Sequence, residues 1–170
     1  MRNISFRNDV LPLKDILYRL ALRITMDPEE AKDIVQDTLI KIWNRRESLS
    51  EIESIEAFSL TICRNLALDS VRMLKGKNNT LDSGYAEKAD SASDPLEKTT
   101  LKDRISIVRQ LLDNLPEKQK SCMQLRDFEG KSYKEIAAVM GITEEQVKVN
   151  IFRARQTVKQ KIKEFDNYGL

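Results

Sequence analysis

Apolar side chains recur at spacings of three and four along most of the chain, which is the period of a helix that packs along one side. In the first half this spacing predicts helices over about residues 10–24, 28–46 and 56–74. Asp27 can cap the second of these helices, and Pro28 suits its first position. The pattern therefore predicts an all-α fold.

Residues 76–100 break this pattern, because they contain almost no large apolar side chain and many Ser, Asp, Asn and Gly residues. Ordering such a segment costs roughly 1 to 2 kcal/mol per residue, and little apolar burial is available to offset that cost. We expect a flexible linker here that joins two small helical domains, residues 1–75 and 101–170.

The C-terminal domain is expected to hold four helices, the last two of which are separated by Gly141. Their apolar faces consist of Ile136, Ala137 and Met140 before the glycine, and Val147, Ile151 and Ala154 after it. Gly141 can adopt the positive φ that ends a helix, and Thr143 can cap the next one. This pattern predicts a helix-turn-helix whose second helix is the recognition helix, although two core helices joined by a tight turn would share these apolar positions.

The distribution of charge favours the DNA-binding interpretation. The net formal charge is only +2, but the positive excess lies in the C-terminal domain. Between residues 148 and 163 every charged side chain is basic: Lys148, Arg153, Arg155, Lys159, Lys161 and Lys163. A helix that carries charge of a single sign is well suited to neutralise phosphates.

Several classes of function are disfavoured by what the sequence lacks. It has no histidine, which removes the commonest general base and metal ligand, and no Walker loop, Gly-rich dinucleotide turn or nucleophile elbow. Cys63 and Cys122 fall at apolar positions of helices, which suits reduced, buried thiols of a cytoplasmic protein. We therefore expect no catalysis, cofactor, metal or small-molecule substrate, and a cytoplasmic location without a membrane span or signal peptide.

Two polar strips follow the apolar faces of the N-terminal helices. The strip on the second helix consists of Asp33, Gln36, Asp37 and Lys41. The strip on the third helix consists of Arg64, Asn65, Asp69 and Arg72. Spacing alone does not distinguish a binding surface from an ordinary solvated helix face at either place.

Three motifs in order along the chain carry a resemblance to a known family. These are AKDIVQDTLIKIW, FSLTICRNLALDSVR and LPEKQKSCMQLRDFEGKSYKEIAAVMGITEEQVKVNIFRAR. They resemble region 2 and region 4 of the extracytoplasmic-function group of bacterial RNA polymerase sigma factors. The resemblance implies a specificity subunit that attaches to RNA polymerase core, directs it to promoters and initiates transcription. Residues 1–75 would form region 2, residues 76–100 the linker and residues 101–170 region 4.

The resemblance also implies roles for the polar strips. The strip Asp33, Gln36, Asp37 and Lys41 would bind the clamp helices of the polymerase β′ subunit. The strip Arg64, Asn65, Asp69 and Arg72 would contact the minus-ten element, and the loop from Ser48 to Ile55 would capture a flipped base of the non-template strand.

The recognition helix would read the minus-thirty-five element in the major groove. Gln146 and Asn150 can pair with adenine edges, Lys148 and Arg153 can reach guanine or phosphate, and Val149 can touch a thymine methyl group. Tyr133, Lys134 and Arg155 are expected to hold the DNA backbone.

An anti-sigma factor, either soluble or membrane-bound, is a further partner that the resemblance implies. A different class of function remains open, in which a one-component repressor or activator binds DNA as a dimer and senses a signal through residues 1–75. The polar strip at Asp33, Gln36 and Asp37 favours the sigma factor, and an enzyme is the most distant alternative.

Overall fold

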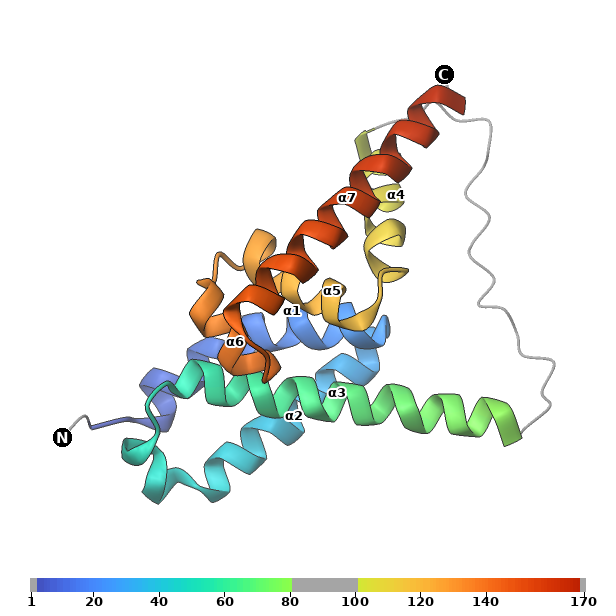
Figure 1. Ribbon diagram of the computed structural model, residues 1–170. Coiled ribbons are helices and arrows are strands. Elements are labelled where there is room, and N and C mark those ends of the chain that lie inside the picture. Colours follow the sequence, from blue (N-terminus) through green and yellow to red (C-terminus); the bar gives the residue numbers. More distant parts are fainter. Residues whose placement is uncertain (1–2, 81–100, 169–170) are drawn as a thin grey trace.

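The computed structural model describes residues 3–80 and 101–168, and all regular structure in these ranges is helical, as predicted (Figure 1). The α-helices are α1 (Lys14–Thr25), α2 (Pro28–Asn44), α3 (Ile55–Thr80), α4 (Leu101–Asp113), α5 (Glu117–Met123), α6 (Tyr133–Met140) and α7 (Glu144–Tyr168). Shorter π or 3-10 turns are η1 (Phe6–Val10), η2 (Leu11–Leu13), η3 (Arg46–Glu51) and η4 (Gln124–Phe128).

Local capping sets the boundary between α1 and α2. Met26 ends α1 in the left-handed conformation with φ 58°, and its N–H bonds to the carbonyl oxygen of Leu22. The Asp27 carboxylate then accepts from the N–H groups of Glu29 at 3.0 Å and Glu30 at 3.4 Å. The predicted cap is therefore confirmed, and it satisfies two backbone donors at the start of α2.

Helix α3 is longer than predicted. It continues to Thr80, five residues into the segment expected to be linker. Once a helix is formed, each further residue adds a hydrogen bond at little cost, so polar residues can extend it. The rest of the expected linker, residues 81–100, lies outside the described residues.

The helix-turn-helix consists of α6 and α7, and the predicted turn residues have the predicted roles. Gly141 has φ 68°, and its N–H bonds to the carbonyl oxygen of Ala137 at 2.9 Å. The Thr143 hydroxyl accepts from the N–H of Gln146 at 3.1 Å, and the Gln146 side chain accepts from the N–H of Thr143 at 2.9 Å. This reciprocal pair fixes the start of α7.

The two helical parts share a hydrophobic core. One cluster of buried side chains joins Leu17, Leu20 and Leu60 of the N-terminal helices to Leu125 and Ile136 of the C-terminal part. Helix α1 packs against α5, and α3 packs against α6 (Figure 1). A smaller cluster between α4 and α7 consists of Leu112, Leu115, Ala154 and Val158. The helices of residues 3–80 therefore pack directly against those of residues 101–168.

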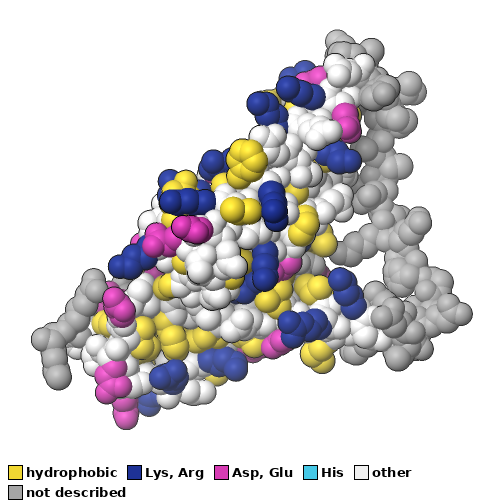
Figure 2. Space-filling model, viewed as in Figure 1, with side chains coloured by type: hydrophobic (Ala, Val, Ile, Leu, Met, Phe, Trp, Pro, Cys, Tyr) yellow, Lys and Arg dark blue, Asp and Glu magenta, His cyan; other side chains and the backbone are white. Residues whose placement is uncertain are grey.

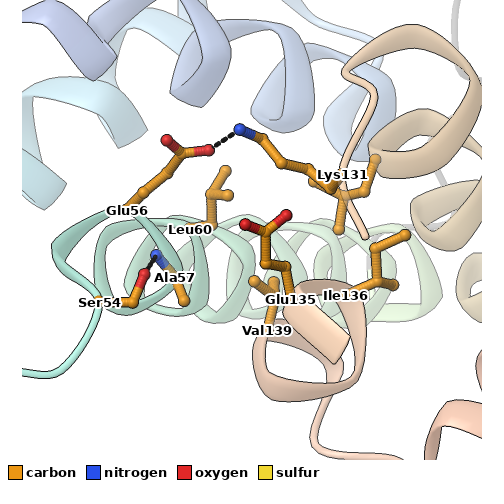
Figure 3. A pocket seen from close by; sticks show the side chains of 9 residues that line it. Ser54, Glu56, Ala57, Leu60, Lys131, Glu135, Ile136 and Val139 are labelled. Atoms are coloured by element: carbon orange, nitrogen blue, oxygen red, sulfur yellow. Dashed lines mark hydrogen bonds and ion pairs between the residues drawn. The ribbon is translucent and has the colours of Figure 1, made fainter. Parts of the chain in front are cut away.

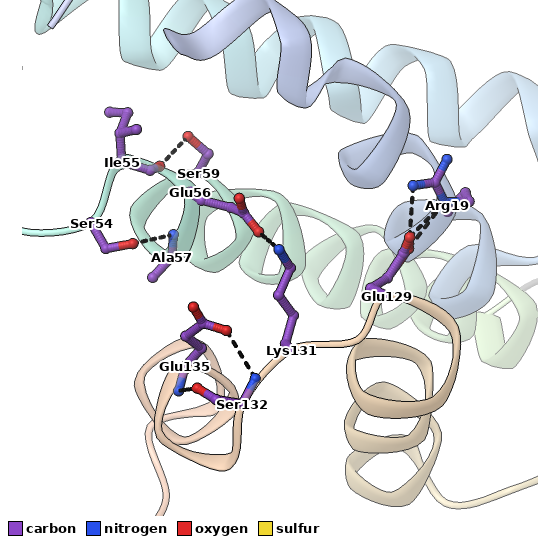
Figure 4. A network of polar contacts seen from close by, with 10 residues as sticks. All are labelled: Arg19, Ser54, Ile55, Glu56, Ala57, Ser59, Glu129, Lys131, Ser132 and Glu135. Atoms are coloured by element: carbon purple, nitrogen blue, oxygen red, sulfur yellow. Dashed lines mark hydrogen bonds and ion pairs between the residues drawn. The ribbon is translucent and has the colours of Figure 1, made fainter.

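Ion pairs cross the same interface at several points. Arg19 pairs with Glu129, and Lys131 pairs with Glu56 (Figure 4). The remaining cross-interface pairs are Arg23 with Asp113 at 3.4 Å and Arg64 with Glu117 at 2.8 Å. In each pair one partner lies in residues 3–80 and the other in residues 101–168, so these contacts orient the two parts relative to each other.

Candidate nucleic-acid interface

The predicted strip on α2 is exposed. Asp33, Gln36, Asp37 and Lys41 all face solvent, because the opposite side of α2 carries the buried side chains. Ile40 lies on the same face and is 56% exposed, although it is large and apolar. Ile40 was not predicted as part of this face, although a large apolar residue outside the apolar stripe of a helix indicates a contact surface. The face combines charge with an apolar contact point, as protein-binding surfaces do.

On α3 three of the four predicted residues share an exposed face. Asn65, Asp69 and Arg72 follow one another at spacings of four and three. The Arg72 guanidinium is 3.9 Å from the Asp69 carboxylate, and both side chains are well exposed. Such a pair contributes little to stability, so both side chains remain available to a partner.

Arg64, the fourth residue predicted for this face, does not lie on it. It is only 8% exposed, and its guanidinium donates to both carboxylate oxygens of Glu117, at 3.1 and 2.8 Å. It lies on the buried side of α3 with Leu60 and Ala67. In this arrangement Arg64 joins the two helical parts and is not accessible to DNA.

The start of α3 lies over a small cavity between the two parts (Figure 3). The cavity measures about 80 Å³ and is lined by Ala57 and Leu60 of α3 and by Ile136 and Val139 of α6. Ser54, at the end of the predicted base-capture loop, accepts from the N–H of Ala57 at 3.1 Å. It is part of the interface between the helical parts.

The outward face of α7 differs in part from the predicted reading surface. Val147, Ile151 and Ala154 are buried, as expected from their spacing. Val149 is exposed, and Phe152, three residues further on, is 63% exposed. Phe152 was not predicted as a contact, because an aromatic residue beside buried positions was not distinguishable from core. Val149 and Phe152 together form an exposed apolar surface that can touch thymine methyl groups.

The two residues predicted to pair with adenine, Gln146 and Asn150, form side-chain hydrogen bonds to nearby backbone groups. The Gln146 side-chain oxygen accepts from the N–H of Thr143. The Asn150 side-chain amide donates to the carbonyl oxygen of Gln146 at 2.8 Å, and Asn150 is half-buried. Bidentate pairing with adenine requires one donor and one acceptor, and a side-chain amide has two N–H donors and two lone pairs on its oxygen, so each of these amides keeps a free donor and a free acceptor site beside its bond.

Basic side chains lie beside Tyr133 of α6 and along the recognition helix α7. Arg126 and Lys148 lie over the Tyr133 ring, at 4.3 and 5.3 Å from its centre. The Arg155 guanidinium bonds to the Asp127 carboxylate, which raises the pKa of Arg155 and partly neutralises its charge. Lys and Arg side chains lie at intervals along α7, with exposed apolar side chains between them (Figure 2). Lys134 and Arg153 are exposed at this surface.

The described residues contain no group of three or more Cys, Asp or Glu side chains placed to hold a metal ion. None of their helices is long and apolar enough to cross a membrane. Cys63 and Cys122 are free and buried, and burial raises their pKa values to about 12 and about 11. Thiols held protonated in this way are poor nucleophiles and poor metal ligands.

Comparison with known proteins identifies the family. The model of Sigma-70 region 2 matches residues 10–76, and that of Sigma-70, region 4 matches residues 105–158. The RNA polymerase sigma-H factor of Pseudomonas aeruginosa is 30% identical over 161 residues, which cover 88% of this chain and 81% of that protein. The chain belongs to the RNA polymerase sigma factors.

Further relatives place this sigma factor in the extracytoplasmic-function group. The ECF RNA polymerase sigma factor SigL of Mycobacterium tuberculosis is 29% identical over 153 residues, covering 88% of this chain and 84% of that protein. Among solved structures, the sigma factor RpoE of Bartonella quintana in complex with the anti-sigma factor NepR is similar, with a TM-score of 0.75. It is 25% identical, and the match covers 93% of this chain and 96% of that one. The protein is therefore a sigma factor that initiates transcription.

Proposed function

We propose that three exposed faces divide the work of this sigma factor. The α2 face with Asp33, Gln36, Asp37 and Lys41 binds the clamp helices of RNA polymerase core, and Ile40 adds an apolar contact there. The α3 face with Asn65, Asp69 and Arg72 contacts the minus-ten element. The outward side of α7 reads the minus-thirty-five element in the major groove. On this division, residues 1–75 act as region 2, 101–170 as region 4, and the segment between them as a linker.

The observation that supports this proposal best is the exposed face of α2. Its charged and apolar side chains do not contribute to the core of the chain, yet they lie on the same molecule as a helix-turn-helix. A one-component repressor would need a sensing module in residues 1–75 instead. The match of residues 10–76 to Sigma-70 region 2 argues against that alternative.

The packed arrangement is proposed to be a form that is not bound to promoter DNA. Arg64 is held by Glu117 across the interface, and the spacing between the DNA-binding helices is set by the shared core. An anti-sigma factor is the proposed partner of this form, which the complex of the similar Bartonella sigma factor with NepR supports. We place the protein in the cytoplasm as a specificity subunit that performs no catalytic step and needs no cofactor.

Charge reversal on α2 tests the polymerase contact. Asp33→Lys with Asp37→Lys should weaken binding to polymerase core by about 2 to 5 kcal/mol, because like or unpaired charge would enter a desolvated contact. The matched control is Glu164→Lys with Asp166→Lys, which changes the net charge equally on an exposed part of α7. Core affinity is measured by titration, and circular dichroism checks that both variants stay helical. Equal affinities of the two double variants would remove the α2 face from the proposal.

A further inference from the structure

One carboxylate lies within the basic surface of the helix-turn-helix. Among the basic side chains between residues 148 and 163, Arg155 alone forms an ion pair with another residue that the structure describes, and its partner is Asp127. The Arg155 Nε donates to one Asp127 carboxylate oxygen at 3.0 Å, and its Nη2 donates to the other oxygen. A carboxylate repels DNA phosphates, so its place on a DNA-binding surface calls for a physical reason.

The geometry of this pair leaves one edge of the guanidinium group free. Asp127 uses the N–H of Nε and one N–H of Nη2. The N–H groups of Nη1 and the second N–H of Nη2 lie at the edge of the fork that points away from Asp127. That edge can bind a phosphate through two parallel hydrogen bonds, and it is accessible because the Arg155 side chain is 50% exposed.

Asp127 is itself held in place by the turn that carries it. It belongs to η4, in which the neighbouring Leu125 is fully buried in the core. The turn is closed by a bond from the N–H of Gly130 to the carbonyl oxygen of Arg126 at 3.1 Å. A carboxylate on an anchored turn can restrict the long Arg155 side chain, which would otherwise sample many rotamers in water.

The pair lies on the side of the helix-turn-helix where other phosphate-binding groups gather. Lys148 precedes Arg155 by two turns of α7, so both side chains lie on the same face of that helix. Lys148 lies over the Tyr133 ring at 5.3 Å from its centre, and Arg126, the residue before Asp127, lies over the same ring at 4.3 Å. Asp127 therefore holds Arg155 on a surface that already carries two cations and a phenol hydroxyl group.

We propose that Asp127 is a positioning residue for promoter binding, which holds the free edge of Arg155 toward a backbone phosphate of the minus-thirty-five duplex. The carboxylate then strengthens DNA binding although it carries the same charge as DNA, because Arg155 loses little rotamer freedom when the phosphate binds. The inference rests on the proposed function, in which the outward side of α7 meets this duplex. Simple repulsion between Asp127 and phosphate predicts the opposite sign, so the sign of the effect decides between them.

Asp127→Asn tests the proposal, because it removes the charge and keeps the size of the side chain. Ordering one long side chain at an interface costs roughly a factor of two to ten in affinity. Polymerase holoenzyme with this variant should therefore bind a promoter fragment that the parent transcribes about two- to tenfold more weakly, as measured by fluorescence anisotropy of the labelled DNA. Weakening of the phosphate contact should also lower the slope of log affinity against log salt by up to about 1, whereas removal of a merely repelling anion would not.

Three further variants separate positioning from charge and from folding. Glu144→Gln, the matched control, removes the same charge from the exposed first turn of α7 and should not weaken binding. Asp127→Glu keeps the carboxylate and should bind close to the parent. Arg155→Ala should weaken binding by itself, and in that background Asp127→Asn should cause no further loss.

Each contrary result has a distinct meaning. Unchanged or tighter binding of Asp127→Asn, or no effect of Arg155→Ala, would overturn the proposal and leave base reading by α7 intact. An equal loss from Asp127→Asn with and without Arg155 would mean that Asp127 acts through the fold, which would also overturn it. Equal binding of the parent holoenzyme to matched and scrambled minus-thirty-five elements would refute the proposed role of α7, and the positioning role with it.

Discussion

Glu117→Gln should loosen the interface between the two helical parts without unfolding either one. The substitution keeps the size of the side chain and removes its charge. Arg64 would then be left as a buried cation without a counter-ion, although the Gln side-chain oxygen can still accept one of its two hydrogen bonds. Separation of the two parts would return Arg64 to water, so the open form gains stability relative to the packed form.

The size of this effect follows from the burial of the pair. Removing one partner of a fully buried ion pair costs about 3 to 5 kcal/mol. The Arg64 side chain is 10% exposed and that of Glu117 is 30% exposed, so partial solvation reduces the cost to about 2 to 3 kcal/mol. At 1.4 kcal/mol for each factor of ten, the population of the open form should rise roughly 30- to 150-fold.

The two cysteines of the chain provide the assay. Cys122 lies at the interface, where Arg64 and Glu117 both influence its charge, and burial raises its pKa to about 11. The Cys63 thiol instead bonds to the carbonyl oxygen of Leu17, inside the N-terminal part. The rate at which a thiol reagent labels Cys122 should therefore report separation of the parts, whereas labelling of Cys63 reports unfolding of the N-terminal helices.

Labelling of Cys122 should rise roughly 30- to 150-fold in Glu117→Gln, in line with the free energy above, while Cys63 labels as slowly as in the parent. Glu29→Gln serves as the control, because its pair with Lys32 is exposed and lies away from the interface. Equal acceleration of both cysteines would mean global unfolding. Unchanged labelling of Cys122 would mean that the Arg64 pair does not hold the parts together, and either result would refute the reasoning.

Three shorter predictions concern the helix-turn-helix, the thiols and the DNA contacts. Gly141→Ala should lower stability to urea by about 1 to 2 kcal/mol, because Gly141 has φ 68° with open space around it, whereas Gly76→Ala within α3 should not. The pKa of Cys122, raised to about 11, makes stability fall as pH rises above about 9, because the unfolded thiol then loses a proton that the folded thiol keeps. The pKa of Cys63, raised to about 12, contributes to the same fall, so Cys122→Ala should reduce it without abolishing it in denaturation between pH 8.5 and 10.5. With polymerase holoenzyme, Phe152→Ala should reduce transcription from a matched promoter more than from one with a scrambled minus-thirty-five element, because an exposed Phe152 can contact a thymine methyl group. Equal losses on the two promoters would contradict the assignment of Phe152.

Features that depend on neighbouring residues in the chain were predictable from the sequence. The caps at Asp27 and Thr143 and the left-handed Gly141 form where expected, because each requires only a side chain and a backbone group two to four residues away. The end of α3 was missed by about five residues, since its last turns are polar and carry no apolar spacing to mark them.

Features that depend on distant partners were not predictable. Arg64 was expected on the DNA side of α3, and its partner Glu117 is 53 residues further along the chain. An apolar stripe in the sequence shows that one face of a helix is covered, but not which helix covers it. The packing of residues 3–80 against residues 101–168 was therefore not predicted. In the recognition helix, the spacing identified Val149 as exposed but could not show that Gln146 and Asn150 bond to the backbone.

Because the core is shared, the packed form can arise only after the C-terminal helices have been synthesised. Leu60 of α3 packs with Leu125, Ile136 and Val139, and Val139 is synthesised about 80 residues later. At roughly 5 to 20 residues per second, the ribosome needs about 4 to 16 s to synthesise the chain from Leu60 to Val139. During this interval the apolar side of α1 and α3 and the Arg64 side chain are accessible on the nascent chain. Each newly made sigma factor therefore passes through an open form, in which a partner can bind residues 1–75 before the packed form exists.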